Sequence, residues 1–456
     1  MQLLSYDEHV EPNKATEIAS ELQSRGYEAW LVGGCVRDMV LGREPKDYDI
    51  ATDATPDQLL KVFPRAQLVG AQFGVILADG VEVATFRSDH AYHDGRRPES
   101  VTFEKDVRRD VLRRDFTINA LLLDPAQLNA PGPLAERVVD YVGGLEDLGR
   151  RRIRAIGDPE QRFEEDHLRM LRAVRFAARF GFEIEPATWD AIRKLHAKIR
   201  RVAPERIRDE LVRILTEGAA RRGLELLQAS CLLKEILPEI AAMQGVEQPP
   251  EFHPEGDVWT HTLLMLDGLK SPTAELALGV LLHDVGKPGT FRRAERIRFD
   301  GHVELGETIA REILTRLRFS NEQIDQVDAL IANHMRFGHV HEMRESTLKR
   351  LLRLPRFEEH LELHRLDCLS SHRNLENYEF VRAKLGESPP EVLRPPRLVT
   401  GEDLIAAGYK PGPDFARMLA LVEDAQLESR IRTREEALAL VRNEFPGAES
   451  KPGRAK

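Results

Sequence analysis

The chain has 456 residues, of which 42% are apolar and 31% are charged, the composition of a globular protein with a buried core. At about 100–200 residues per domain, this length predicts two to four domains. No stretch reaches the roughly 18 apolar residues of a membrane span, and the first residues do not form a secretory signal. We therefore expect no membrane partner and a cytoplasmic location, in agreement with three widely separated cysteines that predict free thiols: Cys35, Cys231 and Cys368.

The net charge of −10 is unevenly distributed along the chain. Residues 105–222 contain 25 Lys and Arg against 20 Asp and Glu, a net charge of +5, which leaves −15 for the rest. Binding to nucleic-acid phosphates requires such a basic band. The same arginines also fit solvated helix faces that form ion pairs within each helix, so charge alone leaves both interpretations open.

The N-terminal part is predicted to form a small mixed sheet. Residues 13–29 show the apolar spacing of a helix that ends at Gly26. Short β-rich runs follow, and Asp79-Gly80 between the last two predicts a hairpin turn. The runs span residues 29–32, 48–51, 67–69, 74–78 and 81–86.

From about residue 155 onward the apolar pattern is almost entirely helical, and Pro-containing stretches at 248–254 and 387–396 indicate linkers. We therefore predict an α+β fold in which a mixed β-sheet head is followed by helical parts. The predicted boundaries are a head at 1–150, a neck and body at 151–248, a second helical domain at 249–385 and a helical tail at 386–456.

Two glycines and three carboxylates in the head predict a site for phosphate and metal. Gly33 and Gly34 join a strand to a helix, where backbone N–H groups can approach phosphate closely, although a tight turn alone has the same pattern. In Asp47-Tyr-Asp49, strand alternation places both carboxylates on one face. Their mutual repulsion favours bound cations, as in paired Mg²⁺ sites that catalyse in-line displacement. Glu82 on a neighbouring strand is the third candidate, and Asp79 in the turn is a poorer one.

At this point the sequence resembles the class II branch of the polymerase-β-like nucleotidyltransferases, which contains CCA-adding enzymes and bacterial poly(A) polymerases. The resemblance is dense over residues 30–215 and rests on motifs that occur in the family's order. These motifs are Gly33-Gly34-x-x-Arg37-Asp38 with Asp47-x-Asp49, Arg113-Arg114-Asp115-Phe-Thr-Ile-Asn119, Asp140-Tyr-Val-Gly143-Gly144, Glu165-Asp166-x-x-Arg169-x-x-Arg172-x-x-Arg175 and Glu205-Arg206-Ile-Arg208-Asp-Glu210.

The resemblance implies that Asp47 and Asp49 are catalytic and hold Mg²⁺, and Glu82, from its position on the neighbouring strand, is predicted to be the third catalytic carboxylate. The resemblance also implies a set of nucleotide-binding residues, and the chemistry of their side chains agrees with this role. Asp166 and Arg169 are three residues apart in a predicted helix, so a carboxylate and a guanidinium can read the edges of C and A without a template. The predicted nucleotide-binding residues are Gly33, Gly34, Arg37, Arg114, Asp115, Asn119, Asp166, Arg169, Arg172 and Arg175.

The stretch from Val69 to Pro98 resembles the tRNA enzymes of this family more than the poly(A) polymerases. Its residues Phe73 and Asp94-Gly95-Arg96-Arg97 match a loop linked to the change from C to A addition. We therefore predict CCA addition to tRNA from CTP and ATP. CC-only or A-only addition and poly(A) synthesis remain alternatives, and the oligomeric state stays open.

A second metal site is predicted after residue 250. His283-Asp284 follows an apolar run, and burial of both side chains requires pairing or a metal. The pattern resembles the HD phosphohydrolase superfamily, which implies binding of a divalent ion such as Ni²⁺, Mn²⁺, Fe²⁺ or Zn²⁺. Asp328 is an alternative to the last ligand, and a stand-alone phosphohydrolase acting on RNA ends is the rival to the transferase. The ligands implied by the resemblance are His261, His283, Asp284 and Asp367, with His302 and His334 as extra histidines of two-metal members.

Overall fold

The computed structural model describes residues 12–70, 74–92 and 98–446. Its internal contacts divide the chain into two compact units. The first contains residues 1–242 and 313–319, and the second contains residues 243–312 and 320–456. Within the described ranges, none of the helices combines the length and apolar character needed to cross a membrane.

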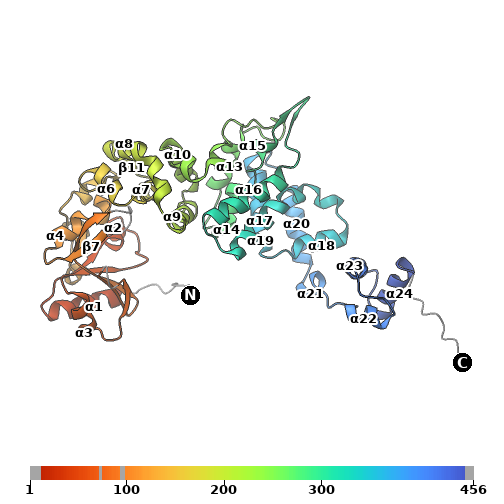
Figure 1. The fold of residues 1–456 in the computed structure, drawn as a ribbon, viewed down its shortest axis with the longest axis horizontal. Coiled ribbons are helices and arrows are strands. Elements are labelled where there is room, and N and C mark those ends of the chain that lie inside the picture. The colour runs from red at the N-terminus through yellow and green to blue at the C-terminus, as the bar shows by residue number, and fades with distance from the viewer. Residues whose placement is uncertain (1–11, 71–73, 93–97, 447–456) are drawn as a thin grey trace. The chain divides into compact units, whose positions relative to one another are not determined.

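A seven-stranded mixed sheet forms the core of the first unit, with strand order β3-β4-β5-β2-β1-β8-β9. Figure 1 shows the N-terminal part of the chain, in red and orange, with helices α1, α2, α3 and α4 labelled. Strands β2 and β5 pair in parallel, and the other neighbours are antiparallel. A separate hairpin pairs β6 with β7. The strands are β1 (Ala29–Val32), β2 (Asp49–Thr52), β3 (Gln67–Gly70), β4 (Val75–Ala78), β5 (Val81–Thr85), β6 (Arg87–Tyr92), β7 (Pro98–Phe103), β8 (Leu122–Leu123) and β9 (Val138–Val139).

Local sequence explains why these strands pair as they do. Asp79 and Gly80 both adopt positive φ angles, 47° and 87°, so they form the turn that joins antiparallel β4 and β5. The parallel register aligns Ile50 of β2 with Val83 of β5, and both side chains are fully buried. The residues that precede them, Asp49 and Glu82, therefore lie at the same level on adjacent strands.

Helices pack around the sheet and continue into the neck of the same unit. The central neck helix α7 (Arg169–Phe180) has an apolar face, and it ends because Gly181 adopts the left-handed conformation. The other helices of this unit are α1 (Pro12–Ser24), α2 (Gly34–Val40), α3 (Pro56–Val62), α4 (Val107–Leu112), α5 (Gly144–Gly149), α6 (Pro159–Glu165), α8 (Pro186–Leu195), α9 (Pro204–Thr216), α10 (Ala220–Ala229), α11 (Leu232–Ile236) and α12 (Pro238–Ala241). The short strands β10 (Arg152–Ile153) and β11 (Glu183–Ile184) pair in parallel.

Over its described residues, the second unit is helical apart from one hairpin, β12 (Arg292–Arg293) with β13 (Ile297–Arg298). Side-chain caps fix several helix starts; for example, Asp257 accepts a hydrogen bond from the backbone of Thr260 at the start of α13. The helices are α13 (Val258–Asp267), α14 (Ala274–Leu282), α15 (Lys287–Thr290), α16 (His302–Arg316, whose end lies in the first unit), α17 (Asn321–Asn333), α18 (Glu345–Leu352), α19 (Phe357–Ser370), α20 (Glu376–Glu387), α21 (Pro390–Leu393), α22 (Gly401–Ala406), α23 (Asp414–Leu427) and α24 (Arg434–Glu444).

The predicted α+β class, a mixed-sheet head followed by helical parts, is confirmed. Strand β2 begins at Asp49 rather than Tyr48, so Asp47 precedes the strand. The four-part division stays a prediction, because the contacts resolve only the two units above. Phe73 and Asp94–Arg97 of the predicted switching loop lie outside the described residues.

Candidate active site and metal centre

Three carboxylates meet at one end of strands β2 and β5. Asp49 is partly buried, whereas Asp47 and Glu82 are exposed. Burial raises the pKa of Asp49 to about 6, and the charges of Glu82 and Asp47 add to this effect while Arg114 opposes it. A carboxylate that its neighbours destabilise in this way is a ligand suited to a divalent cation, so the residues present fit Mg²⁺.

The turn between β1 and α2 approaches these carboxylates closely. Gly33 has φ 75°, and a Cβ there would lie 3.4 Å from Nη1 of Arg114 and 3.9 Å from Oδ2 of Asp49. Arg37 in α2 is buried and donates from Nε to Asp38 at 2.8 Å and from Nη1 to Asn119 Oδ1 at 2.5 Å. The glycine thus leaves room for a ligand beside Asp49, and Arg37 ties α2 to the segment that carries Asn119.

Arg114, Asp115 and Asn119 converge although they do not lie in one continuous helix. Helix α4 ends at Leu112, and Asn119 belongs to the short 3₁₀ helix η2 (Thr117–Asn119). Asn119 donates to Asp115 at 3.1 Å, and Arg172 of α7 donates to the other oxygen at 2.8 Å. Burial alone would raise the pKa of Asp115, but the charge of Arg172 and these hydrogen bonds lower it to about 2. Asp115 therefore stays ionised and links the head to the neck.

Asp166 and Arg169 lie on either side of a helix start, so the prediction that both lie within one helix is wrong. Asp166 has an extended backbone (φ −148°, ψ 104°) between α6 and α7. Its carboxylate accepts two hydrogen bonds from Arg206 of α9, at 3.1 and 2.7 Å. Arg169 donates to Glu165 at 2.6 Å and to the carbonyl oxygen of Arg113 at 3.2 Å. The motif that contains Arg206 does not indicate this pairing, because Asp166 lies 40 residues earlier in the sequence.

Arg175 is only 4% exposed and donates to Glu210 at 2.6 Å, a partner that the sequence interpretation gave no role. All predicted nucleotide-binding residues nevertheless border one cleft of about 530 Å³, which also contains Asp49. Asp47 and Glu82 are not part of its lining. The cleft is lined by Gly33, Gly34, Arg37, Asp49, Arg113, Arg114, Asp115, Asn119, Asp166, Leu168, Arg169, Arg172, Arg175, Phe176, Arg179, Arg206 and Arg213.

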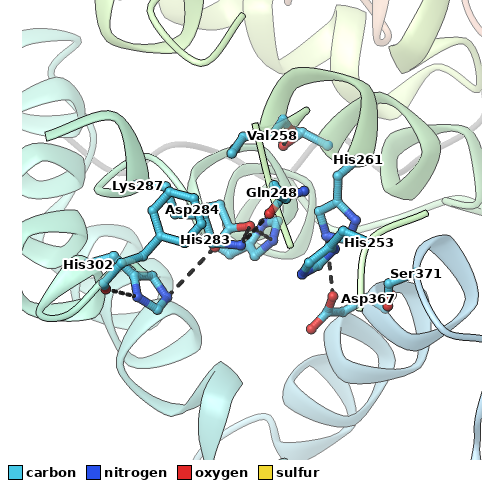
Figure 2. Close-up of polar contacts among 12 residues, drawn as sticks. Gln248, His253, Val258, His261, His283, Asp284, Lys287, His302, Asp367 and Ser371 are labelled. Carbon is cyan, nitrogen blue, oxygen red and sulfur yellow. Dashed lines mark hydrogen bonds and ion pairs between the residues drawn. The ribbon is translucent and has the colours of Figure 1, made fainter. Parts of the chain in front are cut away.

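The second unit brings together all six residues of the predicted HD site (Figure 2 labels five of them). Donor atoms within 4.8 Å of one another form one group from His261, His283 and Asp367 and another from Asp284, His302 and His334. The carboxylate of Asp284 lies between the groups, 3.1 Å from His283 Nε2, 3.8 Å from His302 Nε2 and 3.9 Å from His334 Nε2. Asp367, 3.2 Å from His261 Nε2, occupies the place for which Asp328 was the alternative, since Asp328 pairs with Arg311.

Hydrogen bonds fix the orientation of the four histidine rings. His283, His302 and His334 each place Nδ1 2.7–2.9 Å from a backbone carbonyl oxygen, and His261 places Nδ1 2.7 Å from Glu255. Because these oxygens only accept, Nδ1 carries the proton, which leaves the Nε2 lone pair of a neutral ring for a ligand. All four Nε2 atoms are buried, and none forms a well-aligned hydrogen bond among the described residues, although those of His261 and His283 lie 3.2 and 3.1 Å from carboxylate oxygens. Orphaned imidazole nitrogens beside two carboxylates fit a divalent metal.

Residues around this cluster escaped the sequence interpretation. Glu255 accepts from His261 and also lies 2.9 Å from Nδ1 of His253. Lys287 donates to Gln248 at 2.6 Å and forms an ion pair with Asp284 at 2.7 Å. Gln248, His253 and Glu255 lie in or beside the predicted linker at 248–254, and no periodicity marks them as part of a site.

Comparisons with known proteins agree with this architecture. Residues 29–154 match the family described as "Poly A polymerase head domain", and residues 181–244 match "Probable RNA and SrmB- binding site of polymerase A". Residues 257–367 match the HD domain family.

The CCA-adding enzyme of Enterococcus faecalis is 30% identical over 436 residues, which cover 93% of this chain and 94% of that protein. The CCA-adding enzyme of Bacillus pumilus is 37% identical over 276 residues, but the match covers only 60% of this chain and 63% of that relative. The crystal structure of the Bacillus stearothermophilus CCA-adding enzyme in complex with CTP superposes with a TM-score of 0.72 at 25% identity, covering 96% and 98% of the two chains. The resemblance predicted from the motifs is confirmed, and the chain belongs to the CCA-adding enzyme family of nucleotidyltransferases.

Proposed function

We propose that this protein adds CCA to the 3′ end of tRNA from CTP and ATP, without a template and with release of pyrophosphate. The observation that carries the proposal is the single cleft that contains both Asp49 and the Asp166–Arg169 pair. A carboxylate suited to Mg²⁺ thus shares one space with donors and acceptors suited to a base. The names of the E. faecalis, B. pumilus and B. stearothermophilus relatives support the same activity.

In the proposed reaction, the terminal 3′ hydroxyl of tRNA loses its proton to solvent and its oxygen attacks the α-phosphorus, while the bond from that phosphorus to the pyrophosphate oxygen breaks. Asp47 and Asp49 would hold Mg²⁺, which when bound supplies polarisation of the attacking oxygen and charge neutralisation of the leaving group. Glu82 on β5 lies at the same level as Asp49 on β2 and is the third carboxylate of this group. The backbone turn at Gly33 lets phosphate approach, and Arg114 beside it contributes positive charge.

In this proposal, Asp166 and Arg169 select the base. The Asp166 carboxylate can accept from the exocyclic amine that C and A share, while Arg169 can donate to a ring nitrogen or carbonyl. U and G have a carbonyl oxygen where C and A have the amine. With U or G, the carbonyl oxygen and the Asp166 carboxylate would face each other as two acceptors. Arg172 and Arg175, held by Asp115 and Glu210, add charge beside the same cleft.

The test offers CTP and ATP, singly and together, with Mg²⁺ and tRNA transcripts that end at the discriminator base, at C or at CC. Addition that stops after CCA is expected. Products that stop at CC, extension of the CC transcript alone, or a long A tail would replace the proposal with one of the narrower alternatives. Asp49→Asn should abolish incorporation, whereas Asp79→Asn, in the exposed β4–β5 turn, serves as the matched control.

A second activity is favoured by the histidine geometry. We infer that the second unit binds a divalent ion such as Ni²⁺, Mn²⁺, Fe²⁺ or Zn²⁺ through His261, His283, Asp284 and Asp367, with His302 and His334 forming an adjoining position. The support is the set of four buried Nε2 atoms, none of which forms a well-aligned hydrogen bond among the described residues. A metal held there would supply an activated water for hydrolysis of a phosphoester. Because tRNA is the proposed substrate, we also propose that the protein acts in the cytoplasm.

A further inference from the structure

Nine arginines line the transferase cleft, and the protein itself engages most of them. Seven donate hydrogen bonds to oxygen atoms of the protein, as Arg175 does to Glu210. Among the residues that the structure describes, the two cleft arginines that donate no hydrogen bond are Arg179 and Arg213. Arg213 is exposed, and no ion pair within the described ranges ties it to the head. Arg179 is therefore the arginine beside the head whose donors are free for a ligand.

Arg179 lies beside two carboxylates without a hydrogen bond to either. Its side chain is 22% exposed, and its guanidinium nitrogens lie 3.7 Å from Oδ2 of Asp38 and 3.6 Å from Oε2 of Glu217. Both separations exceed the length of an ordinary N–H···O hydrogen bond, about 2.7–3.2 Å. The same Glu217 oxygen is buried and has no hydrogen-bond partner among the described residues. A guanidinium has five N–H donors, so Arg179 can offer several of them to a ligand in the cleft.

The surroundings of Arg179 place it on the side of the cleft where phosphates approach. The guanidinium carbons of Arg37 and Arg179 lie over the same Phe180 ring, 4.6 and 5.2 Å from its centroid. Arg37 in turn borders the glycine turn, since a Cβ at Gly34 would lie 3.6 Å from its Nη2. The proposed function places the phosphates of the nucleotide at this turn. Phosphate oxygens accept charge-assisted hydrogen bonds from guanidinium groups, so an arginine with free donors here is suited to them.

Helix α7 is long enough to contact both ends of a nucleotide. Arg169, of the proposed base-selecting pair, is its first residue, and Arg179 follows ten residues later. At a rise of 1.5 Å per residue, the two positions are about 15 Å apart along the helix axis. The base and the γ-phosphate lie at opposite ends of a nucleoside triphosphate. A nucleotide whose base meets Arg169 therefore has its phosphates nearer to Arg179.

We propose that Arg179 binds the β- and γ-phosphates of the incoming CTP or ATP and stabilises pyrophosphate as it leaves. The inference rests on the proposed transferase function, and it adds a residue beyond the motifs, which end at Arg175 in this helix. Binding costs no hydrogen bond within the protein, because neither Asp38 nor Glu217 accepts one from Arg179. The negative charge on the leaving group grows as its bond to the α-phosphorus breaks, so the same contact lowers the barrier as well.

The test measures incorporation of CTP and ATP by the full-length protein with Mg²⁺ and tRNA transcripts, and inhibition of this reaction by pyrophosphate. Arg179→Ala should lower kcat/KM for both nucleotides by about tenfold or more, the loss expected for one charge-assisted hydrogen bond. The inhibition constant of pyrophosphate should rise by a similar factor. The KM for tRNA and the selectivity against UTP and GTP should stay unchanged, because Arg179 lies away from the base-selecting pair.

Two further variants show whether the loss is specific to the guanidinium at this place. Arg179→Lys keeps the positive charge but not the planar fork, so it should restore part of the activity. Arg43→Ala is the matched control and should behave as the wild type. Arg43 is exposed and lies over the same Phe180 ring, 5.1 Å from its centroid, but it is not part of the cleft lining.

Glu217→Gln separates phosphate binding from a structural role of Arg179. The substitution removes a negative charge that attracts Arg179, while Arg175 keeps its hydrogen bond to Glu210. We therefore expect kcat/KM for CTP to equal or exceed the wild-type value. A loss as large as that in Arg179→Ala would show that Arg179 acts by holding Glu217, and it would overturn the inference. A raised KM for tRNA in Arg179→Ala, with unchanged nucleotide kinetics and pyrophosphate inhibition, would also overturn it, since Arg179 would then contact RNA.

Titration calorimetry with CTP and with pyrophosphate, in the absence of tRNA, distinguishes this inference from the proposed function. Both ligands should bind the wild type about tenfold more tightly than Arg179→Ala. This difference in a protein that never extends tRNA would refute the transferase function yet support the phosphate site. CCA addition with equal nucleotide kinetics and equal pyrophosphate binding in wild type and Arg179→Ala would overturn the inference and leave the transferase function standing.

Discussion

Arg206 of α9 holds the carboxylate of Asp166 with two hydrogen bonds of 3.1 and 2.7 Å, and both residues line the transferase cleft. The backbone of Leu168 donates a third, at 3.1 Å, to the same carboxylate. A carboxylate has about four lone-pair positions, so these contacts fix its plane and leave acceptor capacity for a base. The orientation of Asp166 therefore depends on a residue 40 positions later in the sequence.

We predict that Arg206→Ala lowers the discrimination of CTP and ATP against UTP and GTP by about tenfold. This corresponds to about 1.4 kcal/mol of the difference in activation free energy, lost when Asp166 is no longer held in place. Arg206→Lys should restore little of it, because lysine keeps the charge but lacks the planar fork. Incorporation rates for the four nucleotides, each offered alone, measure the ratio. Arg221→Ala in α10, an exposed residue that pairs with Glu225, is the control. An unchanged ratio in Arg206→Ala would show that Asp166 is oriented without it.

The elevated pKa of Asp49 predicts a cost in stability. Its folded pKa of about 6 lies above its ordinary value of 3.8, so ionisation of this carboxyl destabilises the metal-free fold. This cost is fully present above pH 6 and disappears as the pH falls below 4. Asp49→Asn should therefore raise the free energy of unfolding by about 1–3 kcal/mol at pH 8 and by almost nothing at pH 4.

Denaturant unfolding in EDTA at the two pH values measures this difference, and Asp47→Asn is the control because Asp47 is exposed. Equal stability of wild type and Asp49→Asn at pH 8 would contradict the electrostatic account. Added Mg²⁺ should stabilise the wild type more than Asp49→Asn, since the cation removes the repulsion.

Local patterns predicted the head well and the polar contacts of the cleft poorly. The hairpin of β4 and β5 could be predicted because Asp-Gly is a residue pair typical of turns with positive φ angles, and Asp79 and Gly80 adopt such angles. The helix expected through Asp166 was wrong because helical spacing continues across the break between α6 and α7, whereas the break itself depends on tertiary contacts. The role of Gln248 could not be predicted, since its partner Lys287 lies 39 residues away in the sequence and meets it only in the folded protein. Glu255 lies only six residues before His261, but it stands in a stretch without periodicity that would mark it as part of a site.

Glu255 should control metal affinity without touching the metal. It accepts from His261 at 2.7 Å and is itself partly buried, so it holds the ring with Nε2 toward the cluster. Loss of such a partner typically weakens metal binding by about 10–100-fold. We predict this loss for Glu255→Ala and a smaller one for Glu255→Gln, whose amide oxygen still accepts.

Titration calorimetry with Mn²⁺ measures the affinity of the metal-free protein. Glu251→Ala provides the matched control, because Glu251 lines the cavity of about 910 Å³ beside the cluster but is exposed. Equal Mn²⁺ affinities in Glu255→Ala and wild type would show that His261 is not a ligand or is held by other contacts. Transferase activity is expected to stay unchanged in both variants, since neither residue belongs to the first unit.

Gly286 sets how closely α16 packs against the segment that follows Asp284. A Cβ at this position would lie 2.1 Å from the carbonyl oxygen of His302 and 2.7 Å from the backbone nitrogen of Gly306, so the backbone has to move. We predict that Gly286→Ala lowers the free energy of unfolding by about 1–3 kcal/mol. The substitution would displace the backbone at His302, so the affinity for metal at the adjoining position should fall as well.

Gly386→Ala in α20 offers the opposite expectation. Nothing lies within 4 Å of a Cβ at Gly386, and alanine favours a helix over glycine by about 1 kcal/mol, so this variant should be slightly more stable. Thermal unfolding of both variants, with and without Mn²⁺, measures the two effects. If Gly286→Ala melts with wild-type stability and gains the same stabilisation from Mn²⁺, α16 has room to shift, and the close packing at His302 does not hold the cluster together.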